Sequence, residues 1–174
     1  MKKTKSEIRK WARGLACKKS EASEKLLENL KSAEVFRRAK NIMIFYPLKN
    51  EVNLLPLLEC EGKNFYLPRI EGENLLCCSF SQGDELCDSC FKTKEPKCAP
   101  TDESILDLII VPALCCDKNR YRLGYGGGFY DRFLSGVKSK TLVCIPQELV
   151  VDTVMPESFD VPVDYVLTED AIYS

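Results

Sequence analysis

Apolar residues at the start of the chain recur every three to four positions, which is the spacing of one face of an α-helix. The first such stripe consists of Ile8, Trp11, Ala12 and Leu15. Thr4 precedes this stripe and Glu7 follows Thr4 by three positions, a pairing typical of a capping box that starts a helix at about Lys5. A second stripe, over residues 22–33, predicts another amphipathic helix.

Short apolar runs follow along the rest of the chain, each bounded by turn residues or proline, and such runs are typical of buried strands. They cover residues 42–46, 65–67, 75–80, 106–111, 141–145 and 165–167. Asn53 as a cap and Pro56 in the first turn predict a short helix over residues 53–59. We expect Pro68 to end its strand and the polar residues 81–104 to form a long loop.

Strands that alternate with helical segments predict an α/β fold. We expect a mostly parallel sheet covered by helices on both faces, in a Rossmann-like three-layer architecture. The 174 residues predict a single domain over 1–174. No apolar run reaches the roughly 20 residues that span a bilayer, and the N-terminus has no apolar signal core. These features predict a cytoplasmic protein with no membrane partner.

The charge is small overall but unevenly distributed. The net charge is −1, yet residues 1–40 carry 13 Lys and Arg against 5 Glu, which leaves 12 against 21 acidic residues for the remainder. A basic arm on an acidic body suggests an anionic ligand near that arm, and it argues against a nucleic-acid duplex, whose phosphates the body would repel. Lys5, Arg9 and Arg13 share one helical face, which is either a solvated basic face or the binding face for such an anion.

The chain contains no histidine, so Ser-His-Asp and Cys-His catalysis and every zinc site that uses histidine are excluded. Its ten cysteines include Cys87, Cys90 and Cys98 in a polar stretch, where a zinc site or a dithiol pair is conceivable. No second Cys-x-x-Cys completes a zinc ligand set. A cysteine-based metal or redox protein is therefore kept only as a minor hypothesis.

The residues that point most directly to chemistry follow the strand at 106–111. Gly124, Gly126, Gly127 and Gly128 lie within five positions, Arg122 precedes them, and Asp131 follows at the start of a helical pattern. Glycine lets backbone amides approach a phosphate, and a helix N-terminus adds partial positive charge. The loop matches neither a Walker motif nor a Gly-x-Gly-x-x-Gly dinucleotide motif. The loop is either a turn whose backbone conformation requires glycine and which binds no ligand, or a site for an anion and a metal. The flanking charges of Arg122 and Asp131 favour the second interpretation.

The segment 122–132, with the sequence RLGYGGGFYDR, resembles the signature of the 5-formyltetrahydrofolate cyclo-ligase family, also called methenyltetrahydrofolate synthetases. Weaker matches occur in the family's order over nearly the whole chain: Lys5 and Arg9, residues 46–51, 66–69, 107–112 and 160–164. The resemblance implies closure of 5-formyltetrahydrofolate to 5,10-methenyltetrahydrofolate, with ATP as co-substrate, Mg²⁺ as cofactor, and release of ADP and phosphate. Such phosphoryl transfer depends on positioning and charge neutralisation, which a chain without histidine can supply.

The resemblance also implies roles for individual residues. The ATP-binding set is Lys5, Arg9, Arg122, Gly124, Gly126, Gly127, Gly128, Phe129 and Tyr130, in which the three cations also stabilise the transferring phosphate. Tyr46, Glu51 and Tyr125 would face the folate. Asp131 and Asp164 would hold the Mg²⁺, and we expect them to meet outside the strand ends of the sheet. Phe129 departs from the family's paired tyrosines, and Tyr121 stands where Asn is common.

A second hypothesis is a non-catalytic nucleotide-binding or regulatory module that keeps the same fold. The joint presence of Lys5, Arg9, Arg122, Asp131 and Asp164 argues against it. We expect a monomer whose partners are small molecules, the folate and ATP, with no nucleic acid.

Overall fold

The computed structural model describes residues 4–15, 22–89 and 93–174. Its large sheet consists of β1 (Asn41–Met43), β2 (Asn64–Glu71), β3 (Asn74–Phe80), β6 (Pro100–Thr101), β7 (Leu108–Ile110), β10 (Lys140–Cys144), β12 (Tyr165–Leu167) and β13 (Ile172–Tyr173). The strand order is β13-β12-β10-β7-β1-β2-β3-β6. The pairings from β12 to β2 are parallel and those at the two edges are antiparallel. The predicted α/β class with a mostly parallel sheet is confirmed.

Smaller elements surround this sheet. A three-stranded sheet joins β8 (Cys115–Asp117), β9 (Arg122–Leu123) and β11 (Val150–Val151), and β4 (Leu86–Asp88) pairs with β5 (Lys94–Pro96). The α-helices are α1 (Lys5–Gly14), α3 (Ser23–Ser32), α4 (Glu34–Arg38) and α5 (Phe129–Leu134). The 3₁₀-helices are η1 (Leu55–Glu59), η2 (Glu103–Ile105) and η3 (Gln147–Leu149). None of the helices described is long and apolar enough to cross a membrane.

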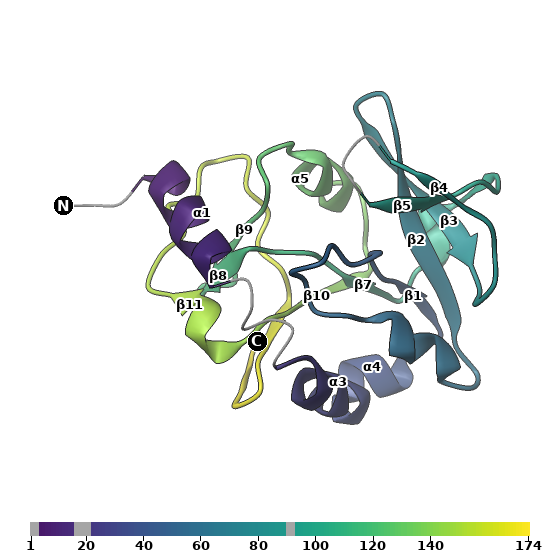
Figure 1. The fold of residues 1–174 in the computed structure, drawn as a ribbon, viewed down its shortest axis with the longest axis horizontal. Helices are drawn as coiled ribbons and strands as arrows, with labels where there is room; N and C mark the ends of the chain where they lie inside the picture. Colours follow the sequence, from purple (N-terminus) through teal and green to yellow (C-terminus); the bar gives the residue numbers. More distant parts are fainter. Residues whose placement is uncertain (1–3, 16–21, 90–92) are drawn as a thin grey trace.

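Successive strand residues point to opposite faces of the large sheet, and both faces are covered by other elements. Ile42 and Ile44 pack with α3 and α4 on one face, whereas Met43 packs with residues of α1 and α5 on the other. In Figure 1, α3 and α4 lie on one side of the sheet and α5 lies on the other. The face towards α5 is covered partly by the β8–β9–β11 sheet. The three-layer prediction had assumed that helices alone would cover this face.

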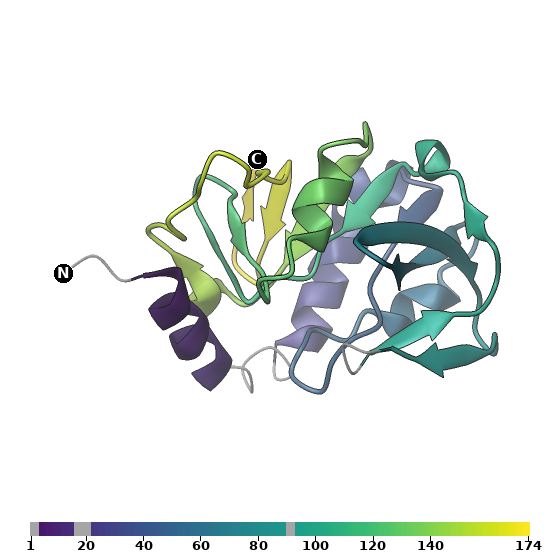
Figure 2. The ribbon, with the colours of Figure 1, turned by 90° about the horizontal axis from the view of Figure 1, so that it is seen from above.

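The first helix begins where the sequence predicts. The Glu7 amide donates to Thr4 Oγ1 at 3.3 Å, and the Thr4 amide donates to Glu7 Oε2 at 2.6 Å, which completes the capping box. Ile8 and Ala12 are buried against the core, as the apolar stripe indicates. Figure 2 shows α1, in dark purple, at one end of the molecule and apart from α3 and α4.

Two local predictions are wrong. Pro68 does not end its strand, since β2 continues to Glu71. The carbonyl of Tyr66 accepts from the Ile44 amide on the β1 side, so two residues later Pro68 presents its missing N–H to that same side, beyond the end of β1. Residues 81–104 contain β4, β5, β6 and η2 where a loop was expected. The short helix predicted over residues 53–59 is present as the 3₁₀-helix η1, with Pro56 in its first turn and Asn53 Oδ1 accepting from the Leu55 amide at 3.1 Å.

Asp117 ties the segment before the glycine loop to a distant part of the chain. Its side chain is buried, with 1% of the residue exposed. Oδ1 accepts from the amides of Asn119 and Tyr121 at 3.0 Å each, and Oδ2 accepts from the amide of Val154 at 3.1 Å. One carboxylate therefore satisfies backbone donors in the β8–β9 turn and in the segment after β11.

Asp117→Ala should lower the free energy of unfolding by about 3 kcal/mol, because three backbone donors lose a charged acceptor and one of them is buried. Urea denaturation of the parent and variant measures this difference. Asp152→Ala is the matched control, since Asp152 is exposed and should change stability by less than about 0.5 kcal/mol. Equal stabilities for the two variants would contradict the role given to Asp117.

Candidate active site

A cavity of about 540 Å³ opens at the edge of the sheet where β1 and β7 end. It is enclosed by α1, the glycine loop, residues 157–160, the segment after β1, and parts of β2 and β5. This is the carboxyl edge of the parallel strands, where ligands commonly bind in α/β sheets. The sequence-predicted residues that line it are Lys5, Arg9, Tyr46, Glu51, Arg122, Gly124, Tyr125, Gly126, Gly127, Gly128, Phe129, Tyr130 and Asp131.

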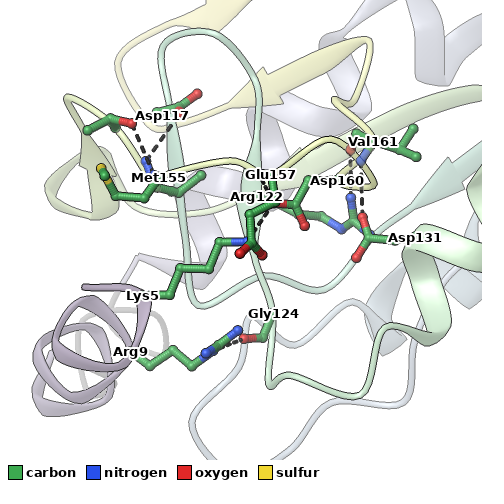
Figure 3. Close-up of polar contacts among 12 residues, drawn as sticks. Lys5, Arg9, Asp117, Arg122, Gly124, Asp131, Met155, Glu157, Asp160 and Val161 are labelled. Carbon is green, nitrogen blue, oxygen red and sulfur yellow. Dashed lines mark hydrogen bonds and ion pairs between the residues drawn. The ribbon is translucent and has the colours of Figure 1, made fainter. Parts of the chain in front are cut away.

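The basic face of α1 lies along this cavity. Lys5 Nζ is 2.7 Å from Glu157 Oε2 and 2.6 Å from Asp160 Oδ2, and Arg9 Nε donates to the Gly124 carbonyl at 3.0 Å (Figure 3). Burial alone would lower the pKa of Lys5, but the two carboxylates outweigh it and raise that pKa. Lys5 is therefore a charged side chain whose present partners an anionic ligand would have to replace.

Arg122 is a buried cation, with 4% of its side chain exposed. Nη1 donates to the Val161 carbonyl at 2.8 Å, and Nη2 lies 3.1 Å from Asp131 Oδ1. The Val161 amide donates to that same oxygen at 3.1 Å. As Figure 3 shows, Arg122 joins the start of the glycine loop to α5 and to the segment after residue 160.

The glycine loop has backbone conformations that only glycine adopts without strain. Gly126 has φ +108°, and Gly128, the residue before α5, has φ +68°. A Cβ on Gly127 would lie 2.8 Å from the ring of Phe129. Because α5 has only six residues, its dipole contributes little. The cations that α1 brings to the loop are Arg9 and Lys5, and Lys5 is paired with Glu157 and Asp160.

The other end of the cavity holds a buried carboxylate paired with a phenol. Glu51 is 7% exposed, its Oε2 accepts from the Leu48 amide at 2.9 Å, and its Oε1 accepts from the Tyr125 hydroxyl at 2.9 Å. Tyr125 is 46% exposed as a residue, yet its hydroxyl end is enclosed. Burial, and then the Glu51 charge, raise the pKa of Tyr125. Tyr46 also lines this end, and its carbonyl accepts from Thr93 Oγ1.

The hydroxyl of Tyr130 is buried and has no hydrogen-bond partner among the described residues. Burial raises its pKa most, Glu51 raises it further, and Arg122 opposes the change. The hydroxyl thus stays protonated at neutral pH. It is the kind of orphaned donor that a bound ligand or water would satisfy.

Asp131 and Asp164 do not meet, which corrects the sequence expectation. Asp164 precedes β12 and therefore lies at the amino edge of the parallel strands, away from the cavity. Its Oδ2 accepts from the amide and hydroxyl of Thr141 at 2.9 Å each, and its Oδ1 is 3.1 Å from Lys140 Nζ. Both oxygens serve to fix the starts of β10 and β12.

Glu157, Phe159, Asp160 and Glu95 line the cavity, although sequence reasoning gave none of them a role. Glu157 and Asp160 reach Lys5 across about 150 positions of sequence, a separation that no local pattern reports. Asp160 does open a family-like motif, which was the one available signal.

Within the described residues, no group of three Cys, Asp or Glu side chains could hold a metal ion. Cys87 Sγ donates to the Glu95 carbonyl at 3.4 Å, and Cys98 Sγ donates to the Ser79 carbonyl at 3.3 Å. Cys90 lies outside the described residues. The minor hypothesis of a cysteine site gains no support from the positions of Cys87 and Cys98.

The 5-formyltetrahydrofolate cyclo-ligase family model matches residues 1–169. This chain belongs to that family. It is 31% identical over 147 residues to the 5-formyltetrahydrofolate cyclo-ligase of Escherichia coli K12, covering 78% of this chain and 81% of that protein. It is 29% identical over 172 residues to the Haemophilus influenzae cyclo-ligase, covering 90% of this chain and 91% of that protein.

Solved structures show the same likeness. The NMR structure of Aquifex aeolicus 5,10-methenyltetrahydrofolate synthetase has a TM-score of 0.84 and 30% identity, and the match covers 97% of this chain and 91% of that one. A Mycoplasma pneumoniae 5,10-methenyltetrahydrofolate synthetase has a TM-score of 0.75 at 18% identity, with coverage of 95% and 98%, which shows the shared fold. The resemblance in the sequence, and the enzyme class inferred from it, are confirmed.

Arg122→Ala should lower the free energy of unfolding by about 2–4 kcal/mol, because it removes a buried cation that bonds two partners. An exposed phosphate ligand, by contrast, could be removed with little loss of stability. Chemical denaturation distinguishes the two expectations. Arg37→Ala, at an exposed arginine, is the control and should stay within about 0.5 kcal/mol of the parent.

Asp164→Asn should destabilise the protein in a pH-dependent way. Burial would raise the pKa of Asp164, but hydrogen bonds from Thr141 and Lys140 lower it below its ordinary 3.8. A carboxyl with a depressed folded-state pKa stabilises the fold above its unfolded pKa and loses that contribution as the pH falls through the folded value. The stability difference between parent and variant should therefore be full near pH 7 and shrink below about pH 4. A constant difference from pH 7 to pH 2 would exclude the ionised role.

Proposed function

We propose that the protein closes 5-formyltetrahydrofolate to 5,10-methenyltetrahydrofolate with ATP as the co-substrate and Mg²⁺ as the cofactor. The observation that carries this proposal is one cavity with two chemically different ends. Lys5, Arg9 and the glycine loop suit a triphosphate at one end, and the Glu51–Tyr125 pair suits a ring with N–H donors at the other.

The reaction joins these two ends. The formyl oxygen attacks the γ-phosphorus of ATP, so that an O–P bond forms and the bond to ADP breaks. Nitrogen 10 of the folate then attacks the formyl carbon and loses its proton, and inorganic phosphate leaves as the C–O bond breaks. Lys5 and Arg9 would neutralise the transferring phosphate, whose transition state is stabilised mainly by positioned charge.

Each remaining group has a role that its present contacts allow. Glu51 would accept hydrogen bonds from the amino and ring N–H groups of the pterin, and Tyr125 and Tyr46 would pack against flat rings. Tyr130, with its buried and unpartnered hydroxyl, can donate where the two ligands meet. Arg122, which lines the cavity, would hold the glycine loop in position through Val161 and Asp131 and would add positive charge near the phosphates.

The donor set of the cavity fits one hard divalent cation. Asp131 uses Oδ1 for Arg122 and Val161, which leaves Oδ2 without a recorded partner among the described residues. Mg²⁺ usually takes one or two protein carboxylates, with water and phosphate oxygens completing its octahedron. Asp131 would hold the ion, which neutralises phosphate charge when bound. Asp164 is not part of this proposal, because its oxygens are bonded at the other edge of the sheet.

Asp131→Asn should raise the Mg²⁺ concentration needed for half-maximal turnover by roughly tenfold or more, since the amide loses the charge that attracts the ion. The assay follows the absorbance of the methenyl product and the release of ADP together. Asp164→Asn is the matched control and should leave the Mg²⁺ requirement unchanged at pH 7. An increased Mg²⁺ requirement in the control alone would reverse the assignment of the two carboxylates.

The same assay tests the function as a whole. The parent protein should form the methenyl product and ADP in equal amounts, and omission of ATP should abolish both. ATP binding without product would instead favour the non-catalytic module. We further propose that the protein is a cytoplasmic monomer with no nucleic-acid partner.

A further inference from the structure

Two exposed aromatic side chains stand at the cavity, and they differ in their surroundings. Among the described residues, Tyr125 and Phe159 are the large exposed hydrophobic residues that also line it, with 46% and 66% exposed. Tyr125 is engaged through its hydroxyl with Glu51. Phe159 has no polar group, and the contact recorded for its ring is with the Lys5 ammonium, 5.5 Å from the ring centre.

Helix α1 sets the order of groups along the cavity. Lys5 lies at the ring of Phe159, Arg9 bonds the Gly124 carbonyl, and the guanidinium of Arg13 lies 6.0 Å from the ring centre of Tyr125. Residues four apart on a helix are spaced by about 6 Å along its axis. The three cations therefore lead from Phe159, past the glycine loop, to Tyr125.

This order places the two aromatic rings at opposite ends of the phosphate-binding groups. The Tyr125 end also contains Glu51, whose carboxylate suits the N–H groups of the folate. A triphosphate that contacts Lys5, Arg9 and the glycine loop with its terminal phosphate towards Tyr125 would carry its nucleoside towards Phe159. A flat base placed there would cover an apolar face that now lies largely in water.

We infer that Phe159 is the stacking platform for the nucleobase of ATP. This inference rests on the proposed function and assigns the base to one end of the cavity. Stacking on an aromatic face tolerates any base, because every base has a π-face. Phenylalanine cannot read hydrogen-bonding edges, so the site favours the larger purines over pyrimidines and distinguishes adenine from guanine weakly.

Phe159→Ala tests the platform by comparing ATP with inorganic tripolyphosphate, which has the phosphates and no base. The Kd for ATP, measured calorimetrically with Mg²⁺, should rise about tenfold, whereas the Kd for tripolyphosphate should change less than twofold. Phe159→Tyr keeps the ring and should bind ATP like the parent. The thermal midpoint should stay unchanged because the residue is exposed. Equal losses for both ligands, or no loss for ATP, would overturn the inference.

A fluorescent reporter gives an independent measurement. The chain has a single tryptophan, Trp11, so F159W adds one indole at the proposed platform. Stacked adenine should quench that added emission, and tripolyphosphate should not. I172W is the matched control, since Ile172 is 48% exposed and does not line the cavity. Quenching by ATP of the same size in both variants, or in neither, would contradict stacking on residue 159.

Turnover separates failure of this inference from failure of the proposed function. If Phe159→Ala retains the parent's KM for ATP while the methenyl product forms, the base lies elsewhere and the function stands. If the parent neither binds ATP nor forms product, both proposals are wrong. The inference predicts a KM for ATP raised about tenfold with kcat nearly unchanged, because the base does not take part in the chemical step.

Discussion

The buried guanidinium of Arg122 is the constraint on which the rest of the cavity depends. A cation with so little exposure must have its donors satisfied by protein groups, since leaving them unpaired would be far more costly than ordering their partners. Asp131 and the Val161 carbonyl supply those acceptors. The requirement brings together the strand before the glycine loop, the helix after it, and a segment 39 positions further along the chain. Those three pieces form one wall of the cavity.

The other groups of the cavity are held in ways that leave them available to ligands. Lys5 is neutralised by Glu157 and Asp160, both of which are side chains at the cavity, so an incoming phosphate exchanges one set of oxygens for another. Glu51 is fixed by a backbone amide through one oxygen and by Tyr125 through the other. Charge is thus prepared at both ends before a ligand arrives, which reduces the reorganisation needed during reaction.

Much of the fold follows from local patterns. The capping box of Thr4 and Glu7 and the buried strand in the apolar run that begins at Ile42 reflect local sequence, and each appears where the pattern indicates. Pro68 was misjudged because its effect depends on where the neighbouring strand β1 ends. The strands within residues 81–104 were missed because they are only two or three residues long and largely polar.

In the candidate site, too, local sequence indicated some features and the tertiary structure decided others. The sequence by itself determined the glycine loop and its flanking charges. The glycines, Arg122 and Asp131 all lie within one contiguous segment, which is also the family signature. It also determined that Lys5 and Arg9 share a helical face. Only the tertiary structure decided that Arg122 is buried, that Phe159 stands beside Lys5, and that Asp164 lies at the other edge of the sheet from Asp131. These features depend on strand direction and on contacts between segments that are separate in the sequence, such as Lys5 with Phe159 and Arg122 with Val161. A one-dimensional pattern contains neither.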